Sequence, residues 1–126
     1  MRQLTLLYFL LLSALQPLRA QTTQALGIAY YNVDKLYDTI PSPFYNDRAY
    51  TPDGDMRWNE ERYRRKINNI VQVIDSMAMP LVALYGVENK QVVEELVRHT
   101  ENDYAYIHKT SNSHNGRDFA LLYYGD

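Results

Sequence analysis

The run Leu81–Val87, LVALYGV, limits the folds open to this chain more than any other segment. Apart from one glycine, every residue in it is apolar or aromatic, which is typical of a strand. Because neither set of alternating positions is polar, both faces of that strand need a covering layer. We therefore expect a sheet with helices or a second sheet packed on each side of this strand.

Two helices flank the strand, and both have clear start signals. Asn59 is a typical N-cap residue, and the glutamates after it suit the positive end of the helix dipole. Apolar residues then recur every three or four positions as far as Met77, which gives one apolar face, and Pro80 is expected to end this helix. Asn89 caps the second helix, whose apolar stripe is narrower.

The remaining segments complete an alternating order. Leu26–Val33 is typical of a buried strand, and residues 38–55 are rich in Pro, Gly, Asp and Ser, which predicts a long loop. Tyr104–Lys109 and Asp118–Tyr124 predict two strands of a hairpin, joined by the polar turn TSNSHNGR. The predicted order is strand, helix, strand, helix, strand, strand.

The first twenty residues differ from the rest of the chain. Arg2 precedes an apolar run, Leu4–Leu15, and the small residue Ala20 precedes the expected cut. The run is too short to cross a bilayer, so we interpret residues 1–20 as a secretory signal peptide, with an uncleaved membrane anchor as the alternative. We expect the mature chain, residues 21–126, to be periplasmic or extracellular.

Charge and cysteine content limit the functions that are possible for the mature chain. The net charge is −2, and cleavage removes two arginines, so electrostatic capture of nucleic acid by the whole surface is not expected. Phosphate chemistry would need a local basic site or a metal ion. Without any cysteine, the exported protein must be held by an ordinary core.

Polar side chains stand at the predicted strand ends, where ligands of α/β proteins tend to collect. A magnesium-type ion takes oxygen ligands and often uses only one or two protein carboxylates. The spacing alone leaves open whether these residues bind a metal or only cap helices and turns. They are Asn32, Asp34, Glu88 and Asp118.

Other polar residues have two interpretations each. His114, in the turn before Asp118, is the only histidine placed for catalysis, and an exposed loop histidine is the alternative. The segment RYRRK, Arg62–Lys66, predicts either a phosphate-contacting face or, with more weight, a solvated helix face paired with the preceding glutamates.

Four segments together carry a family resemblance. They are YYNVDKLYD, YTPDGDMRWNEERYRRKINNIVQVI, PLVALYGVENKQVVEEL and GRDFALLYY. In this order they resemble the exported bacterial branch of the endonuclease/exonuclease/phosphatase family, which has the DNase I-like fold. The resemblance implies an α+β chain that forms the N-terminal half of a four-layer sandwich, two β-sheets with helices outside.

The resemblance also implies an activity and roles for the strand-end residues. The activity is hydrolysis of phosphate esters, nucleic acid among them, with Mg²⁺, Mn²⁺ or Ca²⁺. Asn32 matches an asparagine of the family's metal and phosphate site, and Asp34 falls where some members carry an acidic residue near the metal. Asp118 matches an acidic position with a structural or orienting role, and we take it with His114 as a candidate catalytic residue.

The chain departs from the family pattern at the strand end. The family usually reads EVEN there, with its first glutamate as the metal ligand, whereas this chain reads GVEN. Gly86 takes the ligand position, and Glu88 matches the second acidic residue. If the strand continued, Gly86 and Glu88 would face the same way, so that Glu88 or Asp34 could hold the ion.

A second departure concerns later segments. Motifs such as GDFN and SDH, which position the nucleophilic water and stabilise the phosphate in the family, have no counterpart before Asp126. We expect the 126-residue chain to be inactive alone. The first hypothesis is the N-terminal part of an exported metal-dependent phosphoesterase, nuclease-like in its reaction. The second is a non-catalytic binding module on a degenerate phosphoesterase fold, and the third is a tyrosine-rich interaction domain.

Overall fold

The computed structural model describes residues 26–112 and 115–124. The predicted signal peptide and its cleavage site lie outside the described residues. No helix within the described ranges is both long and apolar enough to cross a membrane. The elements in chain order are β1 (Ile28–Leu36), the 3-10 helix η1 (Arg48–Tyr50), α2 (Glu60–Met77), β2 (Leu81–Val87), α3 (Lys90–His99), β3 (Tyr104–Lys109) and β4 (Asp118–Tyr124).

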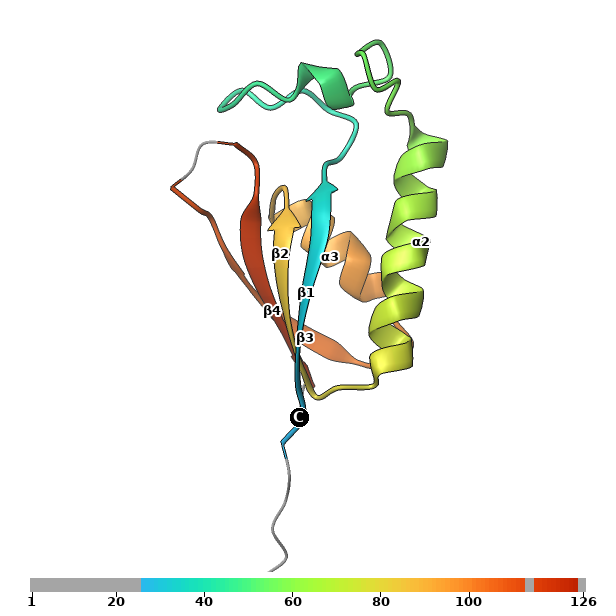
Figure 1. Ribbon diagram of the computed structural model, residues 1–126, viewed down its shortest axis with the longest axis vertical. Coiled ribbons are helices and arrows are strands. Elements are labelled where there is room, and N and C mark those ends of the chain that lie inside the picture. Colours follow the sequence, from blue (N-terminus) through green and yellow to red (C-terminus); the bar gives the residue numbers. More distant parts are fainter. Residues whose placement is uncertain (1–25, 113–114, 125–126) are drawn as a thin grey trace, which may run out of the picture.

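The four strands form one mixed sheet in the order β1-β2-β4-β3. β1 and β2 are parallel, whereas β4 is antiparallel to both β2 and β3, so the predicted hairpin is confirmed. Helices α2 and α3 pack against the same face of the sheet (Figure 1). The α+β class is confirmed, and one sheet with helices on one face agrees with part of a four-layer sandwich.

Both predicted helix starts are confirmed by their caps. The Asn59 side chain accepts a hydrogen bond from the backbone of Arg62, and the Asn89 side chain accepts one from the backbone of Val92. The end of α2 differs from the prediction. The helix stops at Met77, because Ala78 adopts a left-handed conformation with φ of 46°, and Pro80 only follows that stop.

The core lies between the helices and the face of the sheet that they cover, called here the covered face. Alternate positions of the two central strands point into it, as the pleat of a strand requires. Aliphatic residues that are almost fully buried dominate this core. They include Ile67, Ile74, Val82, Leu84, Val93, Leu96 and Leu122.

The opposite face of the sheet, called here the open face, has no covering layer among the described residues. Strand register arranges its side chains in three rows across the sheet. Several large apolar groups are exposed on it, among them Tyr30 at 68%, Ile107 at 56% and Phe119 at 48%. The expectation that both faces of β2 are covered is therefore met on one side only in this part of the chain.

β1 runs further than its sequence predicted, to Leu36 instead of Val33. The pairing of β1 with β2 is irregular between Asn32 and Leu36, where Asp34 and Lys35 both have positive φ values. Neither residue is a glycine, so composition gave no sign of this bulge. This bulge turns the end of β1 and moves the side chains that follow it away from one another.

The segment between β1 and α2, predicted as a long loop, is anchored by aromatic rings. The indole nitrogen of Trp58 donates to the carbonyl oxygen of Tyr37 at 2.9 Å, and the rings of Tyr37 and Tyr50 lie 4.6 Å apart. The segment crosses the end of the sheet where β1 and β2 finish (Figure 1). Its aromatic anchor holds Asp38 and Tyr45 near the strand ends.

Candidate functional site

The carboxyl ends of β1 and β2, the β3–β4 connection and the segment before α2 meet at one end of the sheet (Figure 1). A cavity of about 470 Å³ lies there, and Tyr45, Glu88, His108 and Asp118 are among its lining residues. The register of the sheet brings these residues together from segments that are far apart in the sequence. Two of them, Glu88 and Asp118, were predicted from their strand-end positions.

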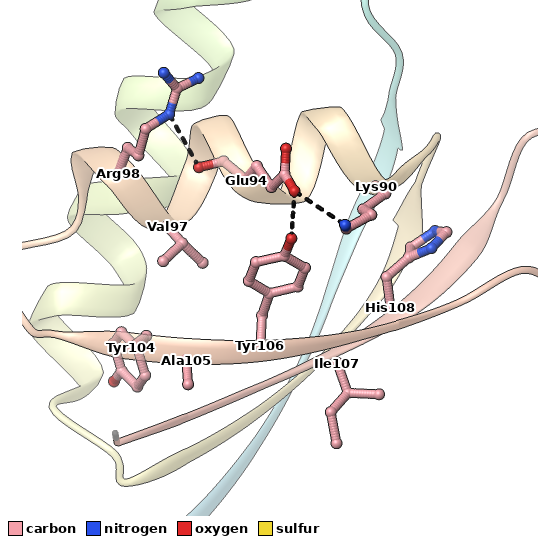
Figure 2. Close-up of a pocket in the computed structure, with 9 residues that line it drawn as sticks. All are labelled: Lys90, Glu94, Val97, Arg98, Tyr104, Ala105, Tyr106, Ile107 and His108. Carbon is pink, nitrogen blue, oxygen red and sulfur yellow. Dashed lines mark hydrogen bonds and ion pairs between the residues drawn. The ribbon is translucent and has the colours of Figure 1, made fainter. Parts of the chain in front are cut away.

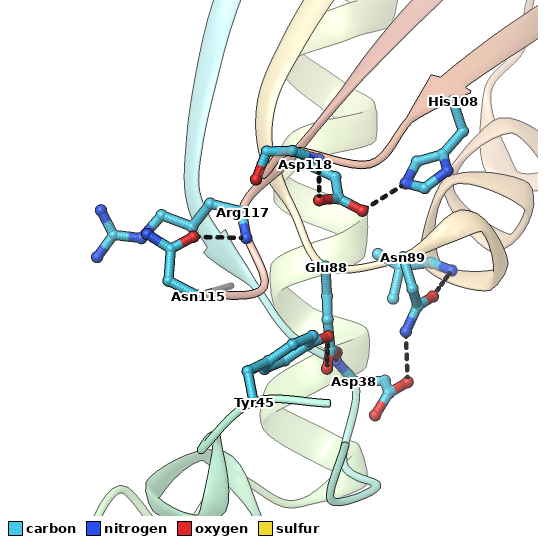
Figure 3. Close-up of polar contacts among 10 residues, drawn as sticks. Asp38, Tyr45, Glu88, Asn89, His108, Asn115, Arg117 and Asp118 are labelled. Atoms are coloured by element: carbon cyan, nitrogen blue, oxygen red, sulfur yellow. Dashed lines mark hydrogen bonds and ion pairs between the residues drawn. The ribbon is translucent and has the colours of Figure 1, made fainter. Parts of the chain in front are cut away.

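The Glu88 carboxyl group is buried, with 3% of the residue exposed, and both of its oxygens are hydrogen-bonded. Oε2 accepts a hydrogen bond from the backbone of Asp38 at 2.6 Å, and Oε1 accepts one from the Tyr45 hydroxyl at 2.8 Å. Figure 3 shows these partners around Glu88. The side chain therefore ties the start of α3 to the segment that follows β1.

Burial also changes the charge state of this carboxyl group. Loss of solvation raises the pKa of Glu88 to about 8, and the hydrogen bond from Asp38 opposes that rise only in part. At neutral pH the protonated form therefore dominates. Such a group suits a structural role at the strand end.

Asp118 forms a second buried polar contact in the same cavity. Its Oδ2 lies 2.9 Å from His108 Nε2, and its Oδ1 accepts a hydrogen bond from the backbone of Ser111 at 2.8 Å (Figure 3). A carboxylate in this position fixes the orientation of the imidazole ring. The geometry suits the orienting role expected for Asp118, and His114 lies outside the described residues.

Asn32 and Gly86 are neighbours on the opposite side of the strand ends. A Cβ atom at Gly86 would lie 3.3 Å from Asn32 Oδ1, and φ at Gly86 is 90°, where side chains are rarely tolerated. The place where the resemblance puts a metal-binding glutamate thus adjoins Asn32 but carries no side chain. Asn32 Oδ1 accepts a hydrogen bond from the backbone of Asp34 at 3.0 Å.

Gly86 and Glu88 do not continue one alternating strand. The pairing of β2 with β4 is irregular between Tyr85 and Val87, and the strand ends at Val87. The bulge at Gly86 breaks the alternation on which the expectation of a shared direction depended. Glu88 consequently points to Tyr45 and the backbone of Asp38, and the space beside Asn32 stays without a carboxylate from β2.

These side chains do not fit a divalent metal ion as they are arranged. In the described ranges no three histidine, cysteine, aspartate or glutamate side chains are grouped closely enough to hold one. Both oxygens of Glu88 accept hydrogen bonds from Asp38 and Tyr45. The role of Asn32, Asp34 and Glu88 as metal ligands stays a prediction.

Arg117 is a residue of the site that the sequence pattern did not single out. It precedes Asp118, and the two side chains leave the strand in different directions (Figure 3). Its guanidinium interacts with the hydroxyl groups of Tyr37 and Tyr85, while the buried Nε atom has no hydrogen-bond partner among residues 26–112 and 115–124. The only sequence signal for Arg117 was its place directly before the predicted strand start at Asp118, because neighbouring side chains of a strand point to opposite faces.

The basic segment of α2 is engaged mostly in structural contacts. Arg62 lies over the Trp58 ring at 5.4 Å, and Arg64 forms an exposed ion pair with Glu60. The Lys66 ammonium donates to backbone carbonyl groups at the bulge of β1, Lys35 among them, and burial lowers its pKa. In the described ranges the Arg64–Glu60 pair matches the expected paired helix face, and a phosphate-contacting role for this segment stays a prediction.

A second hollow lies between α3 and the edge strand β3. Tyr106 donates to Glu94, and Glu94 also pairs with Lys90 at 3.3 Å (Figure 2). The main polar groups that line this hollow are therefore paired with one another. This hollow is a weaker candidate for chemistry than the strand-end cavity.

Comparison with known proteins bears on the family. The model of the endonuclease/exonuclease/phosphatase family matches residues 27–126. Comparisons with curated proteins and with solved structures returned no significant match. The family match spans every strand and helix described above, and it includes Asn32, Gly86, Glu88 and Asp118. The chain therefore belongs to the endonuclease/exonuclease/phosphatase family.

Proposed function

We propose that this protein binds phosphate esters, nucleotides or nucleic acid in particular, and that it does not hydrolyse them by a metal-dependent route. The family as a whole acts on phosphate esters and generally uses divalent metal ions. The observation that carries the proposal is Gly86, which leaves the space beside Asn32 without the carboxylate that the resemblance implies. Without a metal ion at this position, the phosphate has to be bound by side chains of the protein alone.

The surroundings of Glu88 support the same conclusion. Its carboxyl group is buried and accepts two hydrogen bonds, so in this arrangement it does not replace the missing ligand. Moving Glu88 to the other side of the strand end would leave the Tyr45 hydroxyl and the backbone of Asp38 without their acceptor. An unpaired buried polar group costs about 1–3 kcal/mol, which opposes such a movement.

A metal-dependent, nuclease-like phosphoesterase is the second candidate. Family membership favours it, as does the position of Asn32 beside the point where the metal-binding glutamate is expected. When bound, a magnesium-type ion would polarise a phosphate oxygen, and Asn32 and Asp34 would be the residues of this chain nearest to it. This candidate requires further acidic groups to complete the site.

Hydrolysis of bis(p-nitrophenyl) phosphate by the full-length protein separates the two candidates. We expect only background rates with Mg²⁺, Mn²⁺ or EDTA, together with measurable binding of a phosphodiester. If the protein hydrolyses the substrate with Mg²⁺ and loses that activity with Asn32→Ala, the second candidate is correct. In that case the binding proposal fails.

Two variants at one position test the role of Gly86 directly. Gly86→Glu restores a carboxylate beside Asn32, whereas Gly86→Ala adds the same backbone strain without a charge. We expect calorimetry to detect Mg²⁺ binding to Gly86→Glu and not to Gly86→Ala or the parent. If the parent binds Mg²⁺ as tightly as Gly86→Glu does, the absence of a carboxylate at position 86 does not prevent metal binding.

We also propose that the protein is exported, because residues 1–20 have the pattern of a signal peptide. Cell fractionation with N-terminal sequencing of the native protein tests this proposal. The expected first residue of the mature protein is Gln21. Recovery of an intact N-terminus in the membrane fraction would support the anchor alternative.

A further inference from the structure

Strand β3 forms one lateral edge of the sheet in the described ranges, because only β4 lies beside it. All 6 residues of β3 pair with β4 without a shift in register. The other edge strand, β1, is interrupted by the bulge at Asp34 and Lys35, whose carbonyl groups accept hydrogen bonds from the Lys66 ammonium. Natural proteins protect sheet edges with bulges, prolines or covering segments. β3 contains neither a bulge nor a proline, so it is the edge that can accept a further strand.

The register shows which backbone groups of β3 face outward. The backbone N–H of Tyr124 donates to the carbonyl oxygen of Pro80 at 3.2 Å, on the side of β4 that is turned away from β3. Residues that exchange hydrogen bonds alternate along an antiparallel pair, so Tyr104, the partner of Tyr124, directs its backbone groups away from β4. The same alternation turns the N–H and C=O groups of Tyr106 and His108 outward.

A second sheet stacked on the open face would leave this edge as it is. Sheets that pack face to face cover side chains, whereas a strand that joins an edge lies in the plane of the sheet. On the helix side, a hollow of about 920 Å³ lies between β3 and α3 and leaves room for side chains of an added strand. Figure 2 shows Tyr106 and His108 on that side and Ile107 on the opposite side.

The two ends of β3 carry opposite charges. Asp103 directly precedes the strand, and Lys109 is its last residue. Both are exposed, and neither forms an ion pair within the described ranges. Antiparallel pairing of two copies brings Asp103 of each copy to Lys109 of the other, whereas parallel pairing would set like charges side by side. The charges of the edge are therefore complementary to those of a second, antiparallel copy.

We propose that two copies of this protein associate through β3, antiparallel about a two-fold axis at Tyr106, and form one continuous sheet. In this register Tyr106 faces Tyr106 of the second copy, and His108 faces Tyr104, so that outward backbone groups meet. The N–H of Tyr104 does not take part, because it donates to the carbonyl oxygen of Asn102. Asp103 lies opposite Lys109 at both ends. The inference concerns self-association and goes beyond the proposed function.

Other registers of the same strand fit less well. A shift by one residue sets outward backbone groups against residues whose groups face β4. An axis at Ile107 keeps the backbone match but sets Lys109 against Ala105 and removes the charge pairs. On the helix side, Lys90 is already paired with Glu94 at 3.3 Å, which reduces its repulsion of basic groups on the second copy.

Sedimentation equilibrium of the full-length protein tests the inference, at low ionic strength because salt screens exposed charge pairs. We expect a monomer–dimer equilibrium for the parent. Asp103→Lys and Lys109→Asp each set like charges together at both ends of the interface, and each should raise the dissociation constant about tenfold or more. Asp55→Lys is the matched control, because it makes the same change of charge at an exposed position before α2 and should leave the dissociation constant unchanged.

A mixture of the two variants distinguishes this interface from any other. In a heterodimer of Asp103→Lys with Lys109→Asp, both ends again pair opposite charges. The mixture should therefore recover the affinity of the parent, while each variant alone does not, and this recovery would also show that both variants are folded. A mixture that dimerises no better than its components would place the interface elsewhere and overturn the inference.

Two results for the parent would also overturn the inference. One is a monomer at every concentration at which the protein is soluble, whether the rest of the chain or another protein covers the edge. The other is an open-ended aggregate, since pairing about a two-fold axis closes after two copies. Neither result bears on the proposed function, which the binding and hydrolysis of phosphodiesters test separately.

Discussion

The two faces of the sheet differ in how completely their side chains are satisfied. On the covered face the helices bury an aliphatic core, and at the strand ends the carboxyl groups of Glu88 and Asp118 are enclosed and hydrogen-bonded. On the open face large apolar groups are exposed, among them Tyr30, Ile107 and Phe119. The covered face therefore holds the fold together, whereas the open face leaves large apolar groups uncovered in the described part of the chain.

The same difference appears between nearby residues of two short segments, GRD and GVEN. Neighbouring residues of the GRD segment point to different faces, Asp118 into the helix-covered side and Arg117 away from it (Figure 3). In the GVEN segment, Glu88 is likewise buried while Gly86 opens the space beside Asn32. A family motif alone does not reveal which of its residues are available to a ligand.

The largest effect should come from a matched pair of leucines on β4. Leu122 is fully buried on the covered face, and Leu121 is only half-buried on the open face. We expect Leu122→Ala to lower the free energy of unfolding by about 2–5 kcal/mol, and Leu121→Ala by less than about 1 kcal/mol. Urea denaturation of both variants measures this. Equal losses would show that the open face is covered in the protein in solution.

The second prediction concerns the dependence of stability on pH. Because burial raises the pKa of Glu88 from 4.5 to about 8, the folded state prefers the protonated form. This contribution to stability is complete below pH 4.5 and is lost as the pH rises to about 8. The loss amounts to at most about 1.4 kcal/mol per pH unit.

Glu88→Gln tests this dependence, since an amide cannot ionise. Its oxygen can accept the hydrogen bond from the backbone of Asp38, and its nitrogen can donate to the oxygen of the Tyr45 hydroxyl. We expect the variant to match the parent near pH 5 and to be more stable near pH 8, because the loss of stability with rising pH disappears. Urea denaturation across this pH range provides the measurement. An unchanged pH dependence in the variant would mean that Glu88 is not the titrating group.

Two asparagines make the third comparison. Asn89 caps α3 and also donates to Asp38 Oδ2 at 3.0 Å, whereas Asn32 is exposed and makes only a local contact. Asn89→Ala should cost about 1 kcal/mol of stability, and Asn32→Ala less than about 0.5 kcal/mol. Thermal unfolding ranks the two variants. A larger cost at Asn32 would assign it a structural role and weaken the binding proposal.

The smallest effect on stability is expected at Ile107, on the open face of the edge strand. Ile107→Lys should change the free energy of unfolding by no more than about 0.5 kcal/mol while raising solubility, because exposed apolar edges promote aggregation. We also predict poor solubility for residues 21–126 alone. Sedimentation of the parent and the variant at matched concentrations checks both points. A sharp thermal transition from a soluble monomer of residues 21–126 would contradict the second.

The regular part of the fold was predictable from the sequence, because its signals are local. Asn59 and Asn89 cap their helices as expected, and the hairpin of β3 and β4 forms where alternating residues flank a polar turn. The family resemblance, carried by four segments in order, is confirmed by the family match. Apolar periodicity also identified the buried face of α2 correctly.

The site was less predictable, because two bulges decide it. Positive φ values at Asp34 and Lys35 extend and turn β1, and the bulge at Gly86 ends the alternation that placed Glu88 beside it. Positive φ at residues with side chains has no compositional signature. Contacts between distant segments, such as Tyr45 with Glu88, also depend on how the loop before α2 packs.

The affinity of the full-length protein for one labelled oligothymidylate, measured in EDTA and again in Mg²⁺, shows whether this protein binds phosphodiesters without a metal ion. We predict saturable binding in EDTA that Mg²⁺ does not strengthen, since the proposed binding of phosphate esters needs no metal ion. Binding that appears only with Mg²⁺, or cleavage of the oligonucleotide when Mg²⁺ is added, would contradict it.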